Sequence, residues 1–130
     1  MQKLKDQRDR DYADLRNNFA RIVEKYLLLN DRGSKEAIKI LKELDSLFAN
    51  NTQAMNYLIV NQKSIDGSIP LLRAIVKQDV PLVKILLGAG ANPSIENGLP
   101  MKKAEAIGNP AIIHFLKNAI LKNDALMIEN

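Results

Sequence analysis

The sequence of 130 residues contains no cysteine and no tryptophan, and it has a single histidine. Without cysteine there is no disulfide, no thiolate nucleophile and no thiolate metal ligand, which is compatible with a reducing compartment. One histidine, His114, supplies neither a metal site nor a catalytic pair, and the acidic residues show no EF-hand spacing. We expect His114 to be an ordinary surface residue. We therefore predict no metal, no cofactor and no catalytic residue, and hence no enzyme.

Long apolar runs are missing as well. No segment approaches the roughly 20 apolar residues that cross a bilayer, and residues 1–10 are polar throughout. These features predict a soluble, cytoplasmic protein without a secretion leader and without a membrane partner. Export to a host cell by a leaderless route stays open.

Aromatic residues are scarce too, at 5% of the chain, whereas hydrophobic residues make up 46%. A chain of this length and composition can bury one modest core, which aliphatic side chains must fill. No linker rich in proline, glycine and serine divides it. We therefore expect a single domain held together by the packing of aliphatic helices.

Turn and helix signals follow one another in a regular order in the stretch DGSIPLLRAIVKQDVPLVKILLGAGANPSI, residues 66–95. Asp66 and Gly67 are typical of a turn, and Pro70 fits the first turn of a helix. After a polar break, Pro81 fits the start of a second helix. The stretch thus predicts two short antiparallel helices.

Glycines follow the second of these helices. Gly88 and Gly90 permit the left-handed turn that ends a helix, and residues 92–94 are expected to prolong the chain as an extended finger. The GAGANPS sequence lacks the lysine and serine or threonine of a phosphate-binding loop and follows a helix instead of a strand. We interpret it as a structural turn without a bound cofactor.

Together these features resemble the ankyrin repeat, with its DGxTPL opening, inner helix containing alanine, VVKLLL-like outer helix and GADxN exit. A degraded second copy follows, in which Pro100 starts the inner helix and thirty residues separate Ala74 from Ala104. The family period is about 33 residues, so we expect a blunt finger between the two copies. The clear resemblance covers residues 66–121.

A divergent helix pair precedes the clear repeats, in residues 34–65. Ser34 and Thr52 stand where helix caps are expected. The apolar residues of the first helix recur at steps of three and four, at Ala37, Ile38, Leu41, Leu44, Leu47 and Phe48. We interpret the pair as a first repeat that has lost the GADxN exit.

A long amphipathic helix is expected before this pair, from about Lys3 to Leu29. Its apolar residues lie alternately three and four positions apart, at Tyr12, Leu15, Phe19, Ile22, Tyr26 and Leu29. This stripe suits a cap on the exposed end of a repeat stack, and it also suits a coiled coil that pairs two chains. The sequence NDRGS, residues 30–34, separates the helix from the repeats.

The predicted fold class is all-α, a small ankyrin-like stack of helical repeats with an N-terminal capping helix. The predicted single domain, residues 1–130, divides into the segments 1–30, 34–65, 66–96, 97–122 and a tail, 123–130.

The resemblance implies a partner-binding face, because ankyrin-like stacks bind through the turns and inner helices that line a concave groove. The matching residues are Asp66, Ser68, Arg73, Val76, Lys77, Glu96, Asn97, Leu99, Lys102, Lys103, Ala106 and Ile107. Val76, Leu99 and Ile107 would form an apolar centre within a charged rim. Leu72 and Arg73 replace the usual His and Leu of the family, through either function or drift.

The predicted function is a non-enzymatic scaffold, an adaptor or inhibitor that binds another protein and is a monomer more readily than a homodimer. Nucleic acid is a less favoured partner. The net charge of +4, from 19 basic and 15 acidic residues, leaves open an alternative in which Lys102, Lys103, Lys117 and Lys122 bind nucleic acid or an anionic surface. A second alternative is a self-associating structural protein. The abundance of Asn, Lys and Ile fits an AT-rich genome, including that of an intracellular bacterium that secretes effectors.

Overall fold

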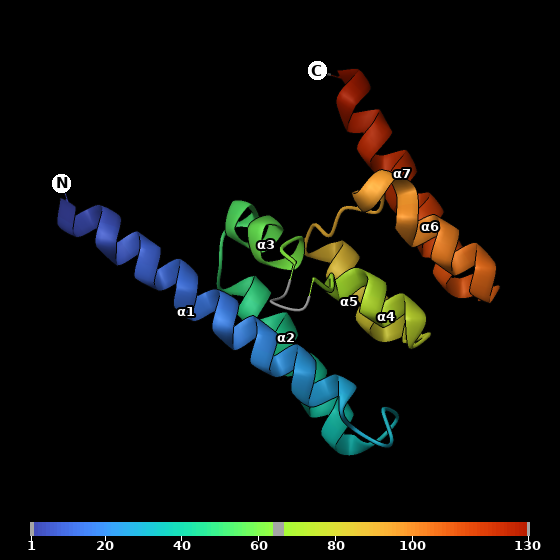
Figure 1. Ribbon diagram of the computed structural model, residues 1–130, viewed down its shortest axis with the longest axis horizontal. Helices are drawn as coiled ribbons and strands as arrows, with labels where there is room; N and C mark the ends of the chain where they lie inside the picture. The colour runs from blue at the N-terminus through green and yellow to red at the C-terminus, as the bar shows by residue number, and fades with distance from the viewer. Residues whose placement is uncertain (1, 64–66, 130) are drawn as a thin grey trace. The chain divides into compact units, whose positions relative to one another are not determined.

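A computed structural model describes residues 2–63 and 67–129, with side chains described for residues 11–63 and 67–123. Within the described residues the chain forms seven helices and no strand (Figure 1), which confirms the predicted all-α class. The chain divides into two compact units, Met1–Ile59 and Val60–Asn130. A single domain with a capping helix stays a prediction.

The first unit contains α1 (Gln2–Leu27), α2 (Lys35–Ala49) and most of α3 (Gln53–Val60). The predicted stripe of α1 provides much of its core, because Phe19, Ile22 and Tyr26 are buried where α1 packs against α2. The ring of Phe19 lies 5.8 Å from that of Phe48 on α2. The stripe is therefore used, in large part, inside the chain.

Both predicted caps of the first unit are present. The Ser34 hydroxyl accepts a hydrogen bond from the Ala37 amide at 3.2 Å, and the Thr52 hydroxyl accepts one from the Met55 amide at 3.1 Å. Each cap satisfies one of the amide groups that the first turn of a helix leaves without a partner.

The predicted apolar stripe of α2 is wrong at one position. Ile38 is 50% exposed, whereas Ile40, which the stripe omits, is 2% exposed. The buried residues are Ala37, Ile40 and Leu44. Steps of three and four from Ala37 reach Ile40 and Leu44, while Ile38 lies about 100° around the helix from Ala37.

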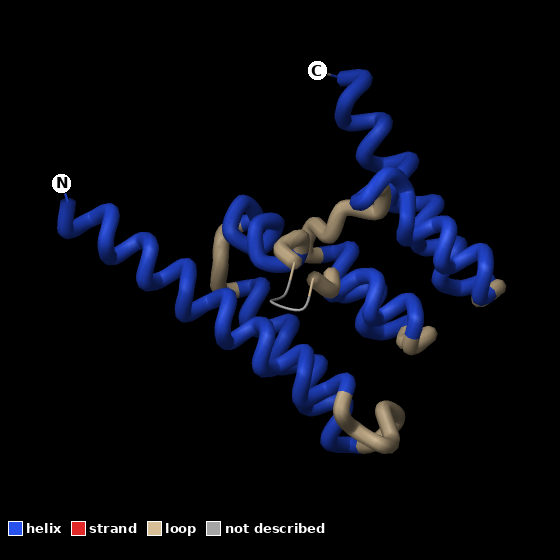
Figure 2. Tube along the Cα trace, viewed as in Figure 1, coloured by secondary structure: helices blue, strands red, loops and turns tan. Residues whose placement is uncertain are grey.

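The second unit consists of two helix pairs. They are α4 (Pro70–Val76) with α5 (Val80–Gly88), and α6 (Ile95–Ile107) with α7 (Pro110–Glu129). The first helices of the pairs, α4 and α6, pack side by side, and so do the second helices, α5 and α7. Figure 2 shows the short loops that join the two helices of each pair. This arrangement is that of a helical repeat, and α7 continues through most of the predicted tail.

The turns between the two helices of each pair are alike, and their matching residues lie thirty positions apart. Gln78 and Gly108 are left-handed, with φ of 54° and 84°. The next residue caps the second helix in both pairs: the Asp79 carboxylate accepts from the Leu82 amide at 3.0 Å, and the Asn109 side-chain oxygen accepts from two amides at the start of α7. These are the amides of Ala111 and Ile112. Asn109 also donates to the Gln78 side chain at 3.5 Å.

Burial repeats at the same spacing with an informative exception. Ala74 and Ala104 are both fully buried. Ile75 is also fully buried, but its equivalent Glu105 is exposed. The difference follows from position, because α6 packs against α4 while no further helix pair lies beyond α6 and α7 in the described part of the chain.

The turn between the pairs corrects two details of the sequence analysis. Gly88 is the last residue of α5. Of the two glycines expected in the turn, only Gly90 is left-handed, with φ of 105°. Residues 92–94 do not extend as a finger, since the Ile95 amide already donates to the Asn92 carbonyl at 3.3 Å. The connection is therefore short and turned.

Candidate functional site

The α4–α6 face is the solvent side of the two first helices in the second unit. It consists of Leu72, Arg73, Val76, Lys77, Lys102, Lys103, Ala106 and Ile107. On each helix these are positions one, four and five apart, which share one side of an α-helix. The opposite side of α4 supplies the buried residues Leu71, Ala74 and Ile75. Burial of one side of each helix thus fixes which residues the other side displays.

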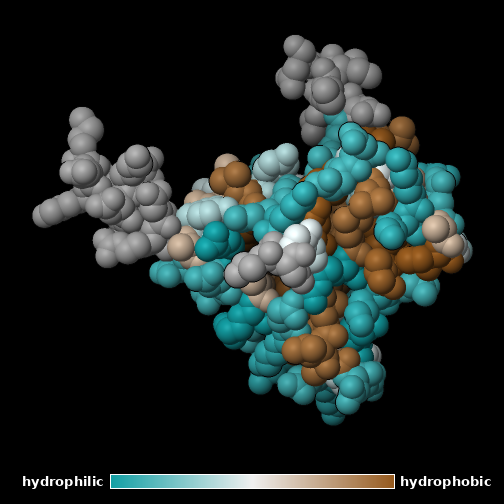
Figure 3. Space-filling view, in the orientation of Figure 1, coloured by the Kyte–Doolittle hydropathy of each residue, from teal (hydrophilic) through white to brown (hydrophobic). Residues whose placement is uncertain are grey.

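Apolar side chains are exposed on this face. Val76 is 55% exposed and Ile107 is 37% exposed, both at the ends of their helices. Leu72 and Arg73 are half-buried, and the other four residues are exposed. Figure 3 shows hydrophobic residues gathered over the second unit on the side that α4 and α6 occupy. Val76 and Ile107 are thus two of the large apolar side chains that are exposed in the described part of the chain.

Basic residues outnumber acidic ones in residues 67–123 of the second unit. Residues 67–123 contain seven lysines and arginines but only three acidic residues, Asp79, Glu96 and Glu105. Asp79 is 5% exposed and caps α5, so it adds little to the surface. Glu96 is paired with Lys63 at 3.0 Å. Glu105 on α6 remains as the exposed acidic group near the α4–α6 face, whose own charged residues are all basic.

The predicted site residues at the turns form a second group. Glu96 and Asn97 are exposed and left-handed, with φ of 54° and 58°, while Ser68 and Leu99 are half-buried. Asp66 lies outside the described residues. Glu96 is engaged by Lys63, so the structure gives it an ion pair within the chain.

Sequence reasoning missed the residues that hold this turn in place. The Asn61 side chain donates to the Gly90 carbonyl at 3.0 Å and accepts from the Asn92 amide at 2.6 Å. Asn61 and Lys63 both follow α3, about one repeat length before the groups that they contact. Their spacing from Asn92 and Glu96 was a usable signal, because equivalent turns of neighbouring repeats lie next to each other.

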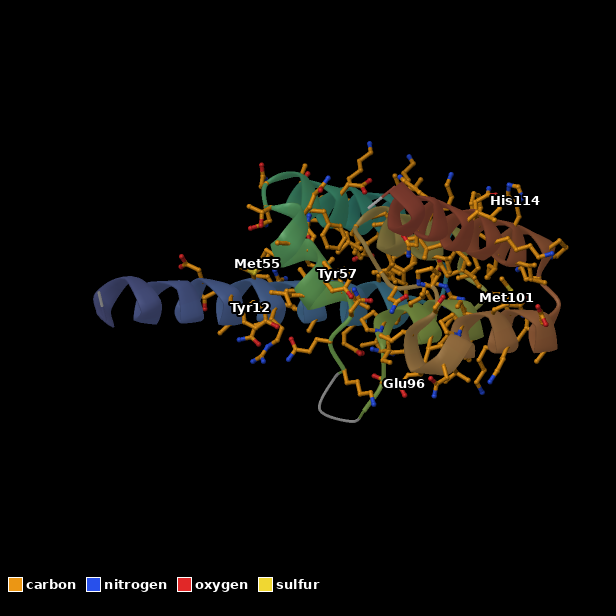
Figure 4. All side chains as sticks on the ribbon, turned by 90° about the horizontal axis from the view of Figure 1, so that it is seen from above. Tyr12, Met55, Tyr57, Glu96, Met101 and His114 are labelled. Atoms are coloured by element: carbon orange, nitrogen blue, oxygen red, sulfur yellow. The ribbon has the colours of Figure 1, made fainter. Side chains whose placement is uncertain are left out.

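His114 lies exposed on α7, as expected for a surface residue. Its Nε2 is 3.1 Å from the Asn118 side-chain nitrogen, and its ring meets that of Phe115 edge-on at 5.6 Å. Lys84 on α5 places its ammonium 5.2 Å from the same phenyl ring. Figure 4 shows His114 on α7 and Glu96 near the start of α6, on opposite sides of the second unit. The contact of Lys84 with Phe115 joins α5 to α7, whereas His114 contacts only residues of its own helix in these interactions.

Few other features of the described residues indicate a function. Among the described residues, no group of three histidine, cysteine or acidic side chains is placed to hold a metal ion. No helix in the described part of the chain has the length and apolar character needed to cross a membrane. Comparison of the chain with family models, curated proteins and solved structures gives no match. The α4–α6 face is therefore the candidate that its geometry supports best.

Proposed function

We propose that helices α4–α7 are two ankyrin-type repeats and that the chain is a non-enzymatic interaction module. It binds a partner protein through the α4–α6 face, as an adaptor or an inhibitor, by occupying a surface and without chemistry. The observation that supports the proposal best is the exposure of Val76 and Ile107 within a group of basic side chains.

Apolar and charged residues have different roles in a protein interface. Apolar side chains contribute affinity when a partner covers them, and surrounding charges guide the encounter and select the partner. The side-by-side packing of α4 and α6 joins the two rows of exposed residues into a single surface. A surface of this kind needs no cofactor. The proposed module acts inside a cell, either the cell that makes it or a host that receives it.

The test is affinity capture from nuclease-treated lysate, with the parent protein compared with the variant Lys77→Glu/Lys103→Glu. Both lysines are exposed, so helicity and melting temperature should not change. We expect one protein to be held by the parent and lost by the variant. The variant Lys117→Glu/Lys122→Glu is the matched control, because it changes the net charge equally on α7, outside the α4–α6 face.

Three outcomes would count against the proposal. A protein retained equally by the parent and the Lys77→Glu/Lys103→Glu variant would remove the assignment of the face. Binding only to nucleic acid, seen before nuclease treatment, would favour the alternative of an anionic polymer as the partner. If the parent protein retains a captured protein only as a dimer, the alternative of a self-associating structural protein would be favoured.

A further inference from the structure

Apolar and basic residues are equally represented on the α4–α6 face. Leu72, Val76, Ala106 and Ile107 are apolar, and Arg73, Lys77, Lys102 and Lys103 are basic. On both helices one apolar residue lies at the C-terminal end of the face, next to the turn that leads to the second helix. A partner that covers the apolar residues must bring its own polar groups close to four cations, because the two kinds of residue are adjacent.

The charged residues of the face itself are all basic. Of the three acidic residues in 67–123, Asp79 is buried as a cap and Glu96 pairs with Lys63. Glu105 is exposed on α6, the helix that carries Lys102 and Lys103. Lys102 and Lys103 are exposed on consecutive positions of α6, where their like charges repel. An acidic partner relieves this repulsion, whereas a basic partner increases it.

The shape of the face favours a helical ligand. Helices α4 and α6 lie side by side and each begins its regular turns at a proline, so their exposed rows run in the same direction. Leu72 and Val76 are four residues apart on α4, which is about 6 Å along the helix. That spacing matches apolar residues at three- and four-residue steps on a ligand helix that lies along α4 and α6.

Nucleic acid is a poorer match to the same surface. Proteins that bind single strands without sequence preference stack bases on aromatic side chains, and none of the eight residues of the α4–α6 face is aromatic. Phosphates would satisfy the lysines but leave Val76 and Ile107 facing a polar backbone. We infer that the partner presents an acidic amphipathic helix whose apolar stripe covers Val76 and Ile107, an inference that rests on the proposed function.

The inference can be tested with purified protein and synthetic peptides. The first peptide is a short helix with leucines at three- and four-residue steps and glutamate elsewhere. The second replaces its leucines with alanine, and the third replaces its glutamates with lysine. Fluorescence anisotropy should show binding of the first, weakening by about tenfold or more for the second, and no binding of the third. Single-stranded oligothymidylate is included as the nucleic-acid probe.

Protein variants assign the binding to the face. Lys102→Glu/Lys103→Glu should weaken the glutamate and leucine peptide by about tenfold or more, while Lys117→Glu/Lys122→Glu should leave its affinity within about twofold. Val76→Ser/Ile107→Ser should weaken the leucine peptide but not the alanine peptide, because only the leucines meet those two side chains. Each variant is checked for unchanged helicity.

The outcomes separate this inference from the proposed function. Equal affinity for the leucine and alanine peptides, or equal loss in the two lysine variants, would overturn the acidic amphipathic helix. Tighter binding of oligothymidylate, lost in Lys102→Glu/Lys103→Glu, would do the same in favour of nucleic acid. If none of the peptides binds while a cellular protein is still captured through Lys77 and Lys103, this inference fails and the proposed function stands.

Discussion

At the scale of single residues, the left-handed position before the second helix of each pair shows how the backbone constrains the sequence. Gly108 occupies it in the second pair without strain, whereas Gln78 occupies it in the first with φ of 54°. A residue with a side chain is disfavoured there, because its Cβ crowds the following carbonyl oxygen. The hydrogen bond from Asn109 to the Gln78 side chain offsets part of that cost.

Replacing Gln78 with glycine should therefore stabilise the second unit. We expect Gln78→Gly to raise the free energy of unfolding by about 0.5–1 kcal/mol, since relief of the strain exceeds the loss of a long, exposed hydrogen bond. Lys77→Gly is the control. Lys77 is right-handed, with φ of −78°, so glycine there should lower stability. Urea denaturation followed by circular dichroism measures both, and a lower midpoint for Gln78→Gly would contradict the explanation.

The cap at Asp79 gives a second test at this scale. Asp79→Ala removes the side-chain acceptor of the Leu82 amide in a buried setting and should cost about 1–2 kcal/mol. Asp79→Asn should cost less, because Asn109 performs the same role in the second pair with an amide oxygen. Equal losses in the two variants would show that the hydrogen bond from Leu82 contributes little. Thermal unfolding of both variants decides between these results.

At the scale of elements, the sequence predicted helices better than it predicted turns. Pro70, Ser34 and Thr52 begin their helices as expected, because a proline or a capping hydroxyl acts locally and its effect is visible in a few residues. The connection between the pairs escaped prediction because it depends on Asn61, which is thirty-one residues away from Asn92 in the chain. Contacts between distant turns leave no local pattern.

Packing between α1 and α2 provides the prediction at this scale. Phe19 is 3% exposed and meets Phe48, so Phe19→Ala should destabilise the first unit by about 3 kcal/mol or more. Ile38→Ala should change stability by less than about 1 kcal/mol, since that side chain is half open to solvent. The loss of helicity during a urea titration measures the stability of both variants. Similar effects would contradict the placement of Ile38 outside the core.

At the scale of the whole molecule, the sequence predicted the all-α class, and the structure confirms it. The site was predicted only as a set of positions. The structure brings eight residues together on the α4–α6 face and separates Glu96 and Asn97 from them at the turn. The repeat spacing could bring the turns that carry Lys63 and Glu96 next to each other, but the ion pair itself depends on how the two side chains are placed in three dimensions.

A prediction about assembly belongs to this scale. Since Phe19, Ile22 and Tyr26 are buried inside the first unit, the α1 stripe has little apolar surface left to pair two chains. We expect light scattering to give the mass of one chain at all accessible concentrations. A concentration-dependent dimer that Tyr12→Ala/Leu15→Ala abolishes would contradict this, because those two residues are the half-buried residues of the stripe within α1.

The contrast between Ile75 and Glu105 bears on where a further helix pair could be added to the second unit. A helix pair added beyond α7 in the manner of its neighbour would bury the Glu105 carboxylate, and an isolated buried charge costs several kcal/mol. Duplication of residues 67–96 in place would instead add a second copy of Ile75, which is apolar, at the equivalent position. Lengthening by internal duplication is thus chemically permitted, and extension past the last pair is penalised at one carboxylate.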